Sequence, residues 1–276
     1  MNTTKIDLMN VSLVCIETRT PELAVFAIQR CRAAANFKEC LLLGTCPKDL
    51  PEGIQHADIG AINSNEEYSD FIIRRLGDYI KGDYVLIVQG DGFIIHPECW
   101  TSEFLRVDYI GAPWPDPMET VGNGGFSLRS RRLLDALKNL SGGVTHPEDD
   151  YICRWHRAEL EAQHGITFAS VELAGKFAFE NIDPGAPTFG FHGIYNVPKV
   201  LPPIDLQNYI KLYNGEILYS ETGRKIIKGL YKNGYYSDAR YLLAGRMKGP
   251  REIRWDTLLL RVRSLLHQYW HRNAND

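Results

Sequence analysis

The sequence lacks the features that mark several common protein classes. It has no secretory signal and no apolar run long enough to cross a membrane. Its six cysteines are scattered without the paired spacing of a zinc site, and we interpret those inside the expected strands and helices as small buried hydrophobic residues. A net charge of −3 gives no broad basic field for nucleic acid. We therefore expect a cytoplasmic protein of a reducing compartment that binds no nucleic acid.

Two nucleotide-binding signatures are also missing. The first expected strand is not followed by G-x-G-x-x-G, and no G-x-x-x-x-G-K-[ST] occurs anywhere in the chain. These absences disfavour dinucleotide-dependent hydride transfer and P-loop NTPase chemistry. What is present is the composition of a globular protein, with 44% hydrophobic and 24% charged residues among 276. That length allows one large domain, or one domain with an appendage.

Strand-like and helix-like segments alternate from the start of the chain to about residue 90. The strand patterns are at 12–17, 40–44, 55–62 and 84–88, and the amphipathic helices are at 21–35 and 65–80. This alternation predicts an α/β fold with a mainly parallel mixed sheet and helices on both faces. After about residue 200 the patterns are helical, so we expect a larger domain over 1–200 and a helical C-terminal appendage over 201–276.

The most informative segment is Gln89-Gly90-Asp91-Gly92, which ends the apolar strand 84–88. Glycine permits tight turns and a close approach of the backbone to a ligand. A carboxylate at the carboxyl end of a central strand lies where an open α/β sheet binds its ligand, so Asp91 could hold a divalent cation. The alternative is an ordinary Asp-Gly turn.

Two later segments could carry polar groups to the same edge. The segment Asn123-Gly124-Gly125 precedes a strand-like run, and its glycines would admit a ligand to the backbone unless they only form a bulge. The run Glu148-Asp149-Asp150 follows Pro147 in the first turn of a helix, where the helix dipole favours anions. These acids either only stabilise the start of the helix or also supply a general base.

Three single residues are further candidates. His192, between aromatic residues and glycine, is either a packed core histidine or a ligand. Arg74 lies in the helix 65–80, where most arginines face solvent, although one could reach a phosphate. Trp114 lies in a proline-interrupted loop and offers a large flat apolar face of the kind that suits stacking on a pyranose ring.

The order of these motifs resembles that of GT-A fold glycosyltransferases, whose domain is Rossmann-like. More narrowly, residues 10–195 are similar to a bacterial family of GT-A-like domains of unknown function. The best outside comparison is the β-1,4-galactosyltransferase type, in which an Asp-x-Asp turn, a Gly-Gly segment, a Glu-Asp-Asp helix and a later histidine follow in this order. The resemblance implies inverting transfer of a sugar from a nucleotide-diphosphate sugar, expected to be a UDP-hexose. The implied acceptor is a hydroxyl of a saccharide or lipid-linked saccharide, in the synthesis of bacterial surface polysaccharide.

The resemblance also implies roles for particular residues. Asp91 matches the last acid of Asp-x-Asp and would bind Mn²⁺ or Mg²⁺ together with His192, whereas Gln89 stands where the first acid would be. Asp149 matches the catalytic base, with Glu148 and Asp150 as support. The donor site is implied to involve Ile16, Glu17, Thr18, Arg19, Arg74, Gln89, Gly90, Asn123, Gly124 and Gly125.

Two other functions compete with this interpretation. A sugar- or nucleotide-binding module with decayed catalysis would explain why Gln89 replaces an acid. A nucleotidyltransferase would need a basic glycine-rich loop after the first strand, and the segment 17–21 offers only Arg19.

The final helical segment, at 255–271, interleaves leucines with arginines. Such a helix could pack on its own domain or pair with a second copy in a homodimer. It could also make a peripheral contact with an anionic membrane at the inner face.

Overall fold

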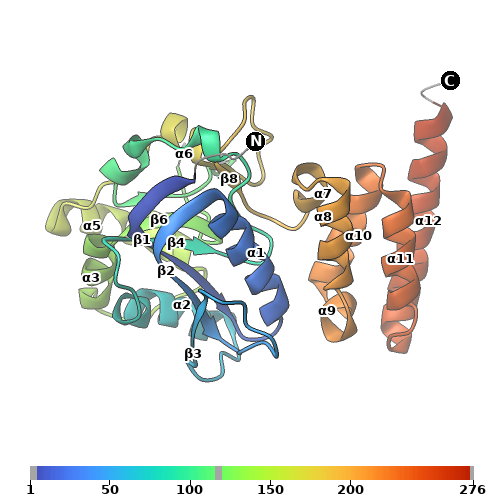
Figure 1. Ribbon diagram of the computed structural model, residues 1–276, viewed down its shortest axis with the longest axis horizontal. Coiled ribbons are helices and arrows are strands. Elements are labelled where there is room, and N and C mark those ends of the chain that lie inside the picture. Colours follow the sequence, from blue (N-terminus) through green and yellow to red (C-terminus); the bar gives the residue numbers. More distant parts are fainter. Residues whose placement is uncertain (1–4, 116–119, 274–276) are drawn as a thin grey trace. The chain divides into compact units, whose positions relative to one another are not determined.

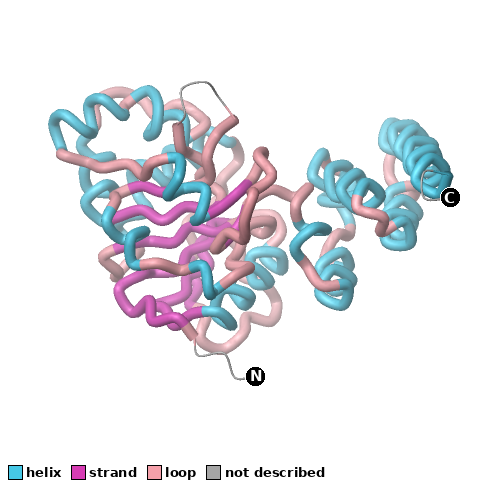
Figure 2. The backbone as a smooth tube through the Cα atoms, turned by 90° about the horizontal axis from the view of Figure 1, so that it is seen from above, coloured by secondary structure: helices cyan, strands magenta, loops and turns pink. Residues whose placement is uncertain are grey.

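The computed structural model describes residues 5–115 and 120–273, and the chain forms two compact units, Met1–His192 and Gly193–Asp276. The first unit contains a six-stranded sheet in the order β3-β2-β1-β4-β6-β5 with helices on both faces, and the second is helical (Figures 1 and 2). The predicted fold class is therefore confirmed. The strands of the sheet are β1 (Ile6–Glu17), β2 (Ala35–Gly44), β3 (Gln55–Ala57), β4 (Tyr84–Val88), β5 (Tyr109–Ile110) and β6 (Phe126–Ser130).

The strand directions bring several chain turns to one edge of the sheet. Strands β3, β2, β1 and β4 are parallel, so the carboxyl ends of β1, β2 and β4 meet at that edge. Strand β6 runs antiparallel to β4, and its first residue, Phe126, pairs with Val88 at the end of β4. The turn after β1, the turn after β4 and the glycine-rich segment before β6 are therefore neighbours. Open α/β sheets bind ligands at such an edge.

Helices cover the two faces of the sheet. On one face, the cluster that contains Val14 and Ile16 packs against η1 (Phe71–Arg75) and α3 (Arg131–Asn139). Successive side chains of a strand point to opposite faces, so Leu13 and Cys15 lie on the other face, where α1 (Pro21–Ala34) packs on β1 and β2 (Figure 1). Burying each such aliphatic side chain contributes roughly 1.5 to 3 kcal/mol.

The predicted helix at 65–80 is present but not uniform. It consists of α2 (Asn65–Asp70), the wider π-helical turn η1 and the 3₁₀ turn η2 (Leu76–Asp78). The expected third strand also differs, because β3 ends at Ala57 and the residues after it leave the sheet. The first two strands begin before their apolar cores, and the extensions include exposed residues such as Met9, which hydrophobic patterning does not detect.

The rest of the first unit consists of short elements around the sheet. These are η3 (Pro97–Cys99), η4 (Ser102–Arg106), α4 (Glu148–Asp150), η5 (Tyr151–Trp155), α5 (Arg157–His164), α6 (Val171–Phe177), β7 (Ala178–Phe179) and β8 (Gly190–Phe191). Gly165 ends α5 with a left-handed φ of 61°, a conformation that glycine adopts without steric cost.

The buried carboxylate of Asp108, just before β5, links the end of β6 and the start of α3 to the segment after α5. It accepts hydrogen bonds from Ser130 Oγ (2.6 Å), Arg132 Nε (3.1 Å), and both the backbone nitrogen (2.8 Å) and Oγ1 (2.9 Å) of Thr167. Burial alone would raise the pKa of Asp108, but these donors outweigh it and hold the pKa below its usual value.

Asp108→Asn should lower the free energy of unfolding by about 2 to 3 kcal/mol, because an amide has a single acceptor oxygen and cannot satisfy all of these donors. Because the pKa of Asp108 is lower in the folded protein, its ionised carboxylate stabilises the fold at pH values above the unfolded-state pKa of about 3.9. That stabilisation is lost as the pH falls through the lower pKa of the folded state. The deficit of the variant, measured by urea unfolding, should therefore shrink in strong acid. Asp135→Asn on the exposed side of α3 is the matched control, and an equal loss there would contradict the assignment.

In the described residues of the second unit, the regular secondary structure is entirely helical. They are α7 (Val197–Val200), α8 (Pro203–Lys211), α9 (Gly215–Tyr219), α10 (Glu221–Lys232), α11 (Tyr236–Arg246) and α12 (Arg251–Asn273). Within it, buried Arg246 donates to the carbonyl oxygens of Leu218 and Ser220 and pairs with Asp256 of α12 at 3.0 Å. Over residues 5–115 and 120–273, no helix is both long and apolar enough to cross a membrane.

Candidate active site

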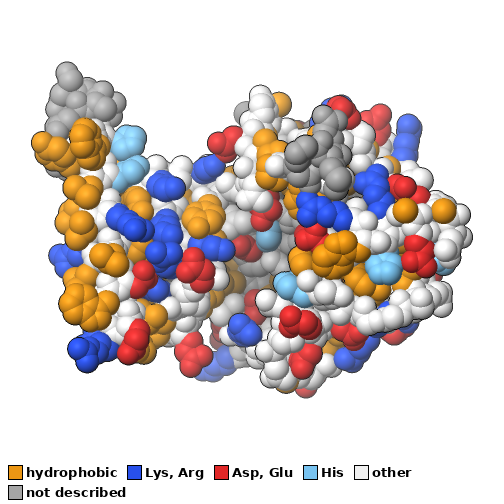
Figure 3. Space-filling view, turned by 180° about the vertical axis from the view of Figure 1, so that it is seen from behind, with side chains coloured by type: hydrophobic (Ala, Val, Ile, Leu, Met, Phe, Trp, Pro, Cys, Tyr) orange, Lys and Arg blue, Asp and Glu red, His pale blue; other side chains and the backbone are white. Residues whose placement is uncertain are grey.

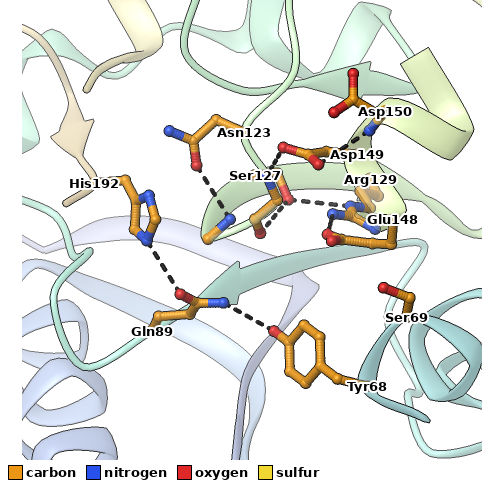
Figure 4. Close-up of polar contacts among 12 residues, drawn as sticks. Tyr68, Ser69, Gln89, Asn123, Ser127, Arg129, Glu148, Asp149, Asp150 and His192 are labelled. Carbon is orange, nitrogen blue, oxygen red and sulfur yellow. Dashed lines mark hydrogen bonds and ion pairs between the residues drawn. The ribbon is translucent and has the colours of Figure 1, made fainter. Parts of the chain in front are cut away.

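Four segments from different parts of the first unit converge at the ligand-binding edge of the sheet (Figure 4). They are the turn after β4, the glycine-rich segment before β6, the start of α4 and the residue after β8. The structure thus brings together Gln89, Asn123, Asp149 and His192, together with Asp91 beside His192, which the sequence offered as separate motifs.

The turn after β4 faces His192. The His192 Nε2 atom lies 3.1 Å from Gln89 Oε1 and 3.5 Å from Asp91 Oδ1. On the other side of the ring, Nδ1 lies 3.1 Å from Glu180 Oε1, which fixes the orientation of the imidazole. The side-chain nitrogen of Gln89 donates to the hydroxyl of Tyr68 at 3.0 Å. The Gln89 side chain is therefore held between the Tyr68 hydroxyl and the His192 imidazole, with its oxygen toward His192.

The charge of His192 follows from its neighbours. Burial lowers the pKa of the imidazole, but the carboxylates of Asp91 and Glu180 outweigh that effect and raise the pKa to about 10. His192 is accordingly a cation at neutral pH in the ligand-free protein. The alternative interpretation of the sequence was a packed core histidine, and the structure places this ring between the carboxylates of Asp91 and Glu180.

Two glycines allow this convergence. A Cβ atom on Gly125 would lie 2.1 Å from His192 Nε2, and a Cβ atom on Gly124 would lie 1.7 Å from Glu148 Oε1. Real Cβ atoms do not approach other heavy atoms so closely, so any larger residue would displace the histidine or the acid. Gly124 and Gly125 are thus required for the packing of the site, whether or not a sugar contacts them.

The three acids at the start of α4 have different surroundings. Glu148 forms a buried ion pair with Arg129 at 2.8 Å, in which the side chains are 7% and 0% exposed. Asp150 pairs with Arg154 one helical turn later. Asp149 is held by backbone donors, since its carboxylate accepts from Gly124 N at 3.3 Å and from Asp150 N at 3.0 Å.

Asp149 is therefore the acid of this run that no arginine neutralises directly. Burial raises the pKa of its carboxyl group, and the negative charge of Glu148 raises it further. A raised pKa makes the carboxylate a stronger base, which is the property that general-base catalysis requires. Glu148 instead balances the charge of Arg129.

Asn123 occupies a special backbone position between these groups. It has a left-handed φ of 64°, and its Oδ1 atom accepts a hydrogen bond from Gly125 N at 3.2 Å. The residue is 3% exposed, yet its Nδ2 atom has no hydrogen-bond partner among the described residues. A buried donor without a partner is costly, so a bound ligand that accepts from Nδ2 would remove that cost.

A cavity of about 650 Å³ opens beside the carboxyl ends of β1 and β2. It is lined by Thr18, Arg19, Gly44, Thr45, Cys46, His56, Asp58, Gly60, Ala61, Ile62 and Asn63. Sequence reasoning proposed Thr18 and Arg19 but missed the residues after β2 and β3. The expected parallel direction of these strands could have indicated the residues after β2 and β3, because it places the carboxyl ends of β1, β2 and β3 together.

Ile16 and Glu17 do not line this cavity. Ile16 is a buried core residue. Glu17 instead shapes the turn, since its Oε1 atom accepts hydrogen bonds from the backbone nitrogens of Arg19 (2.6 Å) and Thr20 (3.0 Å).

Arg74 does not reach the site. Its guanidinium donates to four backbone carbonyl oxygens at and beyond the end of α3: Leu137 (3.0 Å), Lys138 (3.0 Å), Leu140 (2.7 Å) and Gly142 (2.9 Å). The end of a helix leaves carbonyl groups without intrahelical partners, and an arginine satisfies them well. The sequence prediction that Arg74 binds the nucleotide sugar is corrected to this helix-capping role.

Trp114 is half-buried and already has a partner. The Arg154 guanidinium lies 3.9 Å from the centroid of its ring. If a sugar stacks on Trp114 as predicted, it would contact the part of the indole ring that the Arg154 guanidinium does not cover.

The residues around His192 offer a partial donor set for a divalent cation. Asp91 supplies a carboxylate, His192 an imidazole nitrogen and Gln89 an amide oxygen, and the Asp91 and Gln89 oxygens lie 3.5 Å and 3.1 Å from His192 Nε2. In the described part of the chain, no group of three His, Cys, Asp or Glu side chains could hold a metal ion. The set fits Mn²⁺ or Mg²⁺ only when substrate phosphates complete the coordination, as is common for Mg²⁺.

Two solved structures similar to this chain are glycosyltransferases. GlyE of Streptococcus pneumoniae TIGR4 matches 68% of the chain at 12% identity with a TM-score of 0.39, and the chain spans 54% of its length. The mannosyltransferase PcManGT of Pyrobaculum calidifontis, solved with GDP-Man and Mn²⁺, matches 95% of the chain at 11% identity with a TM-score of 0.41, over 82% of its own length. At these values the likeness carries no information about activity.

No curated protein matches the chain significantly in sequence. A family model described as "Protein of unknown function (DUF5672)" matches residues 53–192, just over half of the chain and including the turn after β4, the acidic run and His192. The chain therefore belongs to the DUF5672 family.

Proposed function

We propose that the unit Met1–His192 is the catalytic domain of an inverting glycosyltransferase that uses a nucleotide-diphosphate sugar. The observation that carries the proposal is the placement of Asp149. This partly buried carboxylate with a raised pKa lies at the edge formed by the carboxyl ends of β1, β2 and β4, where His192, which is paired with Asp91, also lies. A base and an anion-binding group at one edge are what sugar transfer from a diphosphate requires.

The donor nucleotide would occupy the cavity beside β1 and β2. Its volume of about 650 Å³ is in the range of small-molecule sites. The lining combines the exposed Arg19 guanidinium, which suits a phosphate, with Asp58 and Asn63, which suit the hydrogen-bonding groups of a base or ribose. We expect the donor to be a UDP-hexose.

The leaving diphosphate would lie at Asp91 and His192. These two residues, with Gln89, would hold Mn²⁺ or Mg²⁺, which when bound supplies positive charge that stabilises the departing diphosphate. Glu180 would keep the His192 ring oriented through its contact with Nδ1.

The acceptor hydroxyl would give its proton to the Asp149 carboxylate as its oxygen attacks the anomeric carbon. Attack from the side opposite the diphosphate inverts the configuration at that carbon. The Asn123 Nδ2 atom would donate to a sugar hydroxyl, which would give this buried donor the partner it lacks.

The acceptor is expected to be a saccharide or a lipid-linked saccharide in bacterial surface polysaccharide synthesis. Trp114 and the Arg154 guanidinium on its ring would present a combined apolar and charged surface to that sugar.

The proposal predicts slow donor hydrolysis by the purified protein. The chain would be incubated with a panel of nucleotide sugars and Mn²⁺, and nucleoside diphosphate release would be followed by chromatography. We expect one donor, a UDP-hexose, to be hydrolysed, because water can replace the acceptor at the base. Addition of the correct saccharide should accelerate release and give a product of inverted configuration by NMR.

Other outcomes would redirect the assignment. Tight binding of a nucleotide sugar with no turnover in the presence of saccharide acceptors would favour the alternative of a catalytically decayed binding module. Release of pyrophosphate from a nucleoside triphosphate and a sugar phosphate would instead indicate a nucleotidyltransferase.

A further inference from the structure

Helix α12 carries a continuous apolar face that the second unit does not cover. We define the apolar face of α12 by its large exposed side chains: Trp255, Leu258, Leu259, Val262, Leu265, Leu266, Tyr269 and Trp270, which are 40–70% exposed. Apolar side chains gather along this helix in Figure 3, with Lys and Arg side chains beside them. At 1.5 Å per residue the face is about 22 Å long.

The folding of the second unit uses the opposite side of α12. Thr257, Leu260 and Ser264 are buried there, against α10 and α11. Asp256 is also engaged, through ion pairs with Arg224 and Arg246. The unit therefore has its own core without the apolar face, which is far more apolar than the exposed side of an ordinary surface helix.

The charges beside the apolar face are almost all positive. At about 100° per residue, exposed Arg254 and Arg261 lie along one edge and exposed Arg263 along the other. Glu252, in the first turn, is the acid of α12 that faces solvent among its described side chains. The segment Gly193–Asp276 as a whole has fourteen Lys and Arg against seven Asp and Glu, although the complete chain has a net charge of −3.

We propose that the apolar face of α12 binds the surface of a bilayer that contains anionic phospholipid. The leucines and valine would enter the boundary between headgroups and acyl chains, and the arginines on both edges would contact lipid phosphates. Trp255 near one end and Tyr269 with Trp270 near the other fit the headgroup level, where amphipathic aromatic rings are favoured.

The same charges disfavour a second copy as the occupant. Two such faces brought together would place arginine edges against arginine edges, and like charges across an interface weaken it. A stable helix pair normally carries opposite charges beside its apolar seam. This inference rests on α12 alone and does not depend on the proposed glycosyl transfer.

The test is co-sedimentation of the full-length protein with vesicles. We expect binding to vesicles of equal parts phosphatidylcholine and phosphatidylglycerol, and little binding to pure phosphatidylcholine. Leu259→Glu with Val262→Glu should abolish binding, because both side chains lie in the centre of the face. Removing the edge charges with Arg261→Gln and Arg263→Gln should weaken binding about fivefold for each arginine.

A matched control is Ile204→Glu, which makes the same change at a position of α8 that is 65% exposed and outside the face. It should bind like the parent, and circular dichroism should show that all variants fold. Equal binding to neutral vesicles, or none to either kind, would overturn the proposal. So would a dimer in lipid-free solution that Leu259→Glu with Val262→Glu converts to monomer, because a second copy would then be the occupant.

Discussion

Replacing Asp149 by asparagine is expected to reduce sugar transfer by about 10²- to 10⁴-fold, the usual loss when a positioned base is removed. Donor affinity should stay unchanged, because the cavity beside β1 and β2 does not include this residue. Asparagine keeps one side-chain oxygen, so it can retain one of the two hydrogen bonds that Asp149 accepts from Gly124 N and Asp150 N, and the fold should also persist. Single-turnover rates and calorimetric donor binding measure the two effects separately.

Two neighbouring acids serve as controls for Asp149. Asp150→Asn breaks a surface-side pair with Arg154 and should reduce the rate far less. Glu148→Gln should instead destabilise the fold, by about 3 to 5 kcal/mol, because it leaves the Arg129 charge buried without its counterion. If Glu148→Gln folds normally and loses more activity than Asp149→Asn, then Glu148 is the base.

The pH dependence of the rate provides an independent readout of Asp149. The base acts in its ionised form, so the rate falls as the pH drops through the pKa of this carboxyl. Because burial and the Glu148 charge raise that pKa, the acid limb should lie above the ordinary aspartate value of about 3.9. Asp149→Asn should remove this limb from the residual activity.

The second large effect is expected at the diphosphate end of the site. Asp91→Asn should abolish the Mn²⁺-dependent part of nucleoside diphosphate affinity, since it removes the carboxylate beside His192 and Gln89. Calorimetric titrations with and without Mn²⁺ isolate that part. Glu180→Gln is the matched control, because Glu180 contacts the far nitrogen of His192 and should influence affinity only through the orientation of the ring.

A different result would identify a metal-free site. With its pKa raised to about 10, His192 carries a charge that could itself neutralise a phosphate oxygen. In that case affinity would not respond to Mn²⁺, and His192→Gln would weaken binding in its absence. Unchanged metal-dependent affinity in Asp91→Asn would likewise remove Asp91 from the assignment.

The sequence by itself determined the α/β class and indicated the edge of the sheet at which the candidate site residues lie. Strand-like runs separated by amphipathic helices have few arrangements other than a mainly parallel sheet, and parallel strands end at one edge. The turn from Gln89 to Asp91 follows such a run and could therefore be placed at that edge without coordinates, whereas the segment from Asn123 to Gly125 lies there because β6 runs antiparallel to β4. Local patterns suffice because hydrophobic periodicity is a local property and a helix that connects two neighbouring strands makes them parallel.

The tertiary structure decided which side chain is available at that edge. The acids Glu148, Asp149 and Asp150 are equivalent as a pattern, and the pairing of Arg129 with Glu148 and of Arg154 with Asp150 separates them. Arg74 donates instead to carbonyl oxygens more than sixty residues away in the sequence. The exposure of the apolar face of α12 depends on which side of that helix the second unit buries. Partners distant in sequence set the charge, burial and hydrogen bonding of a side chain, so these outcomes required the folded chain.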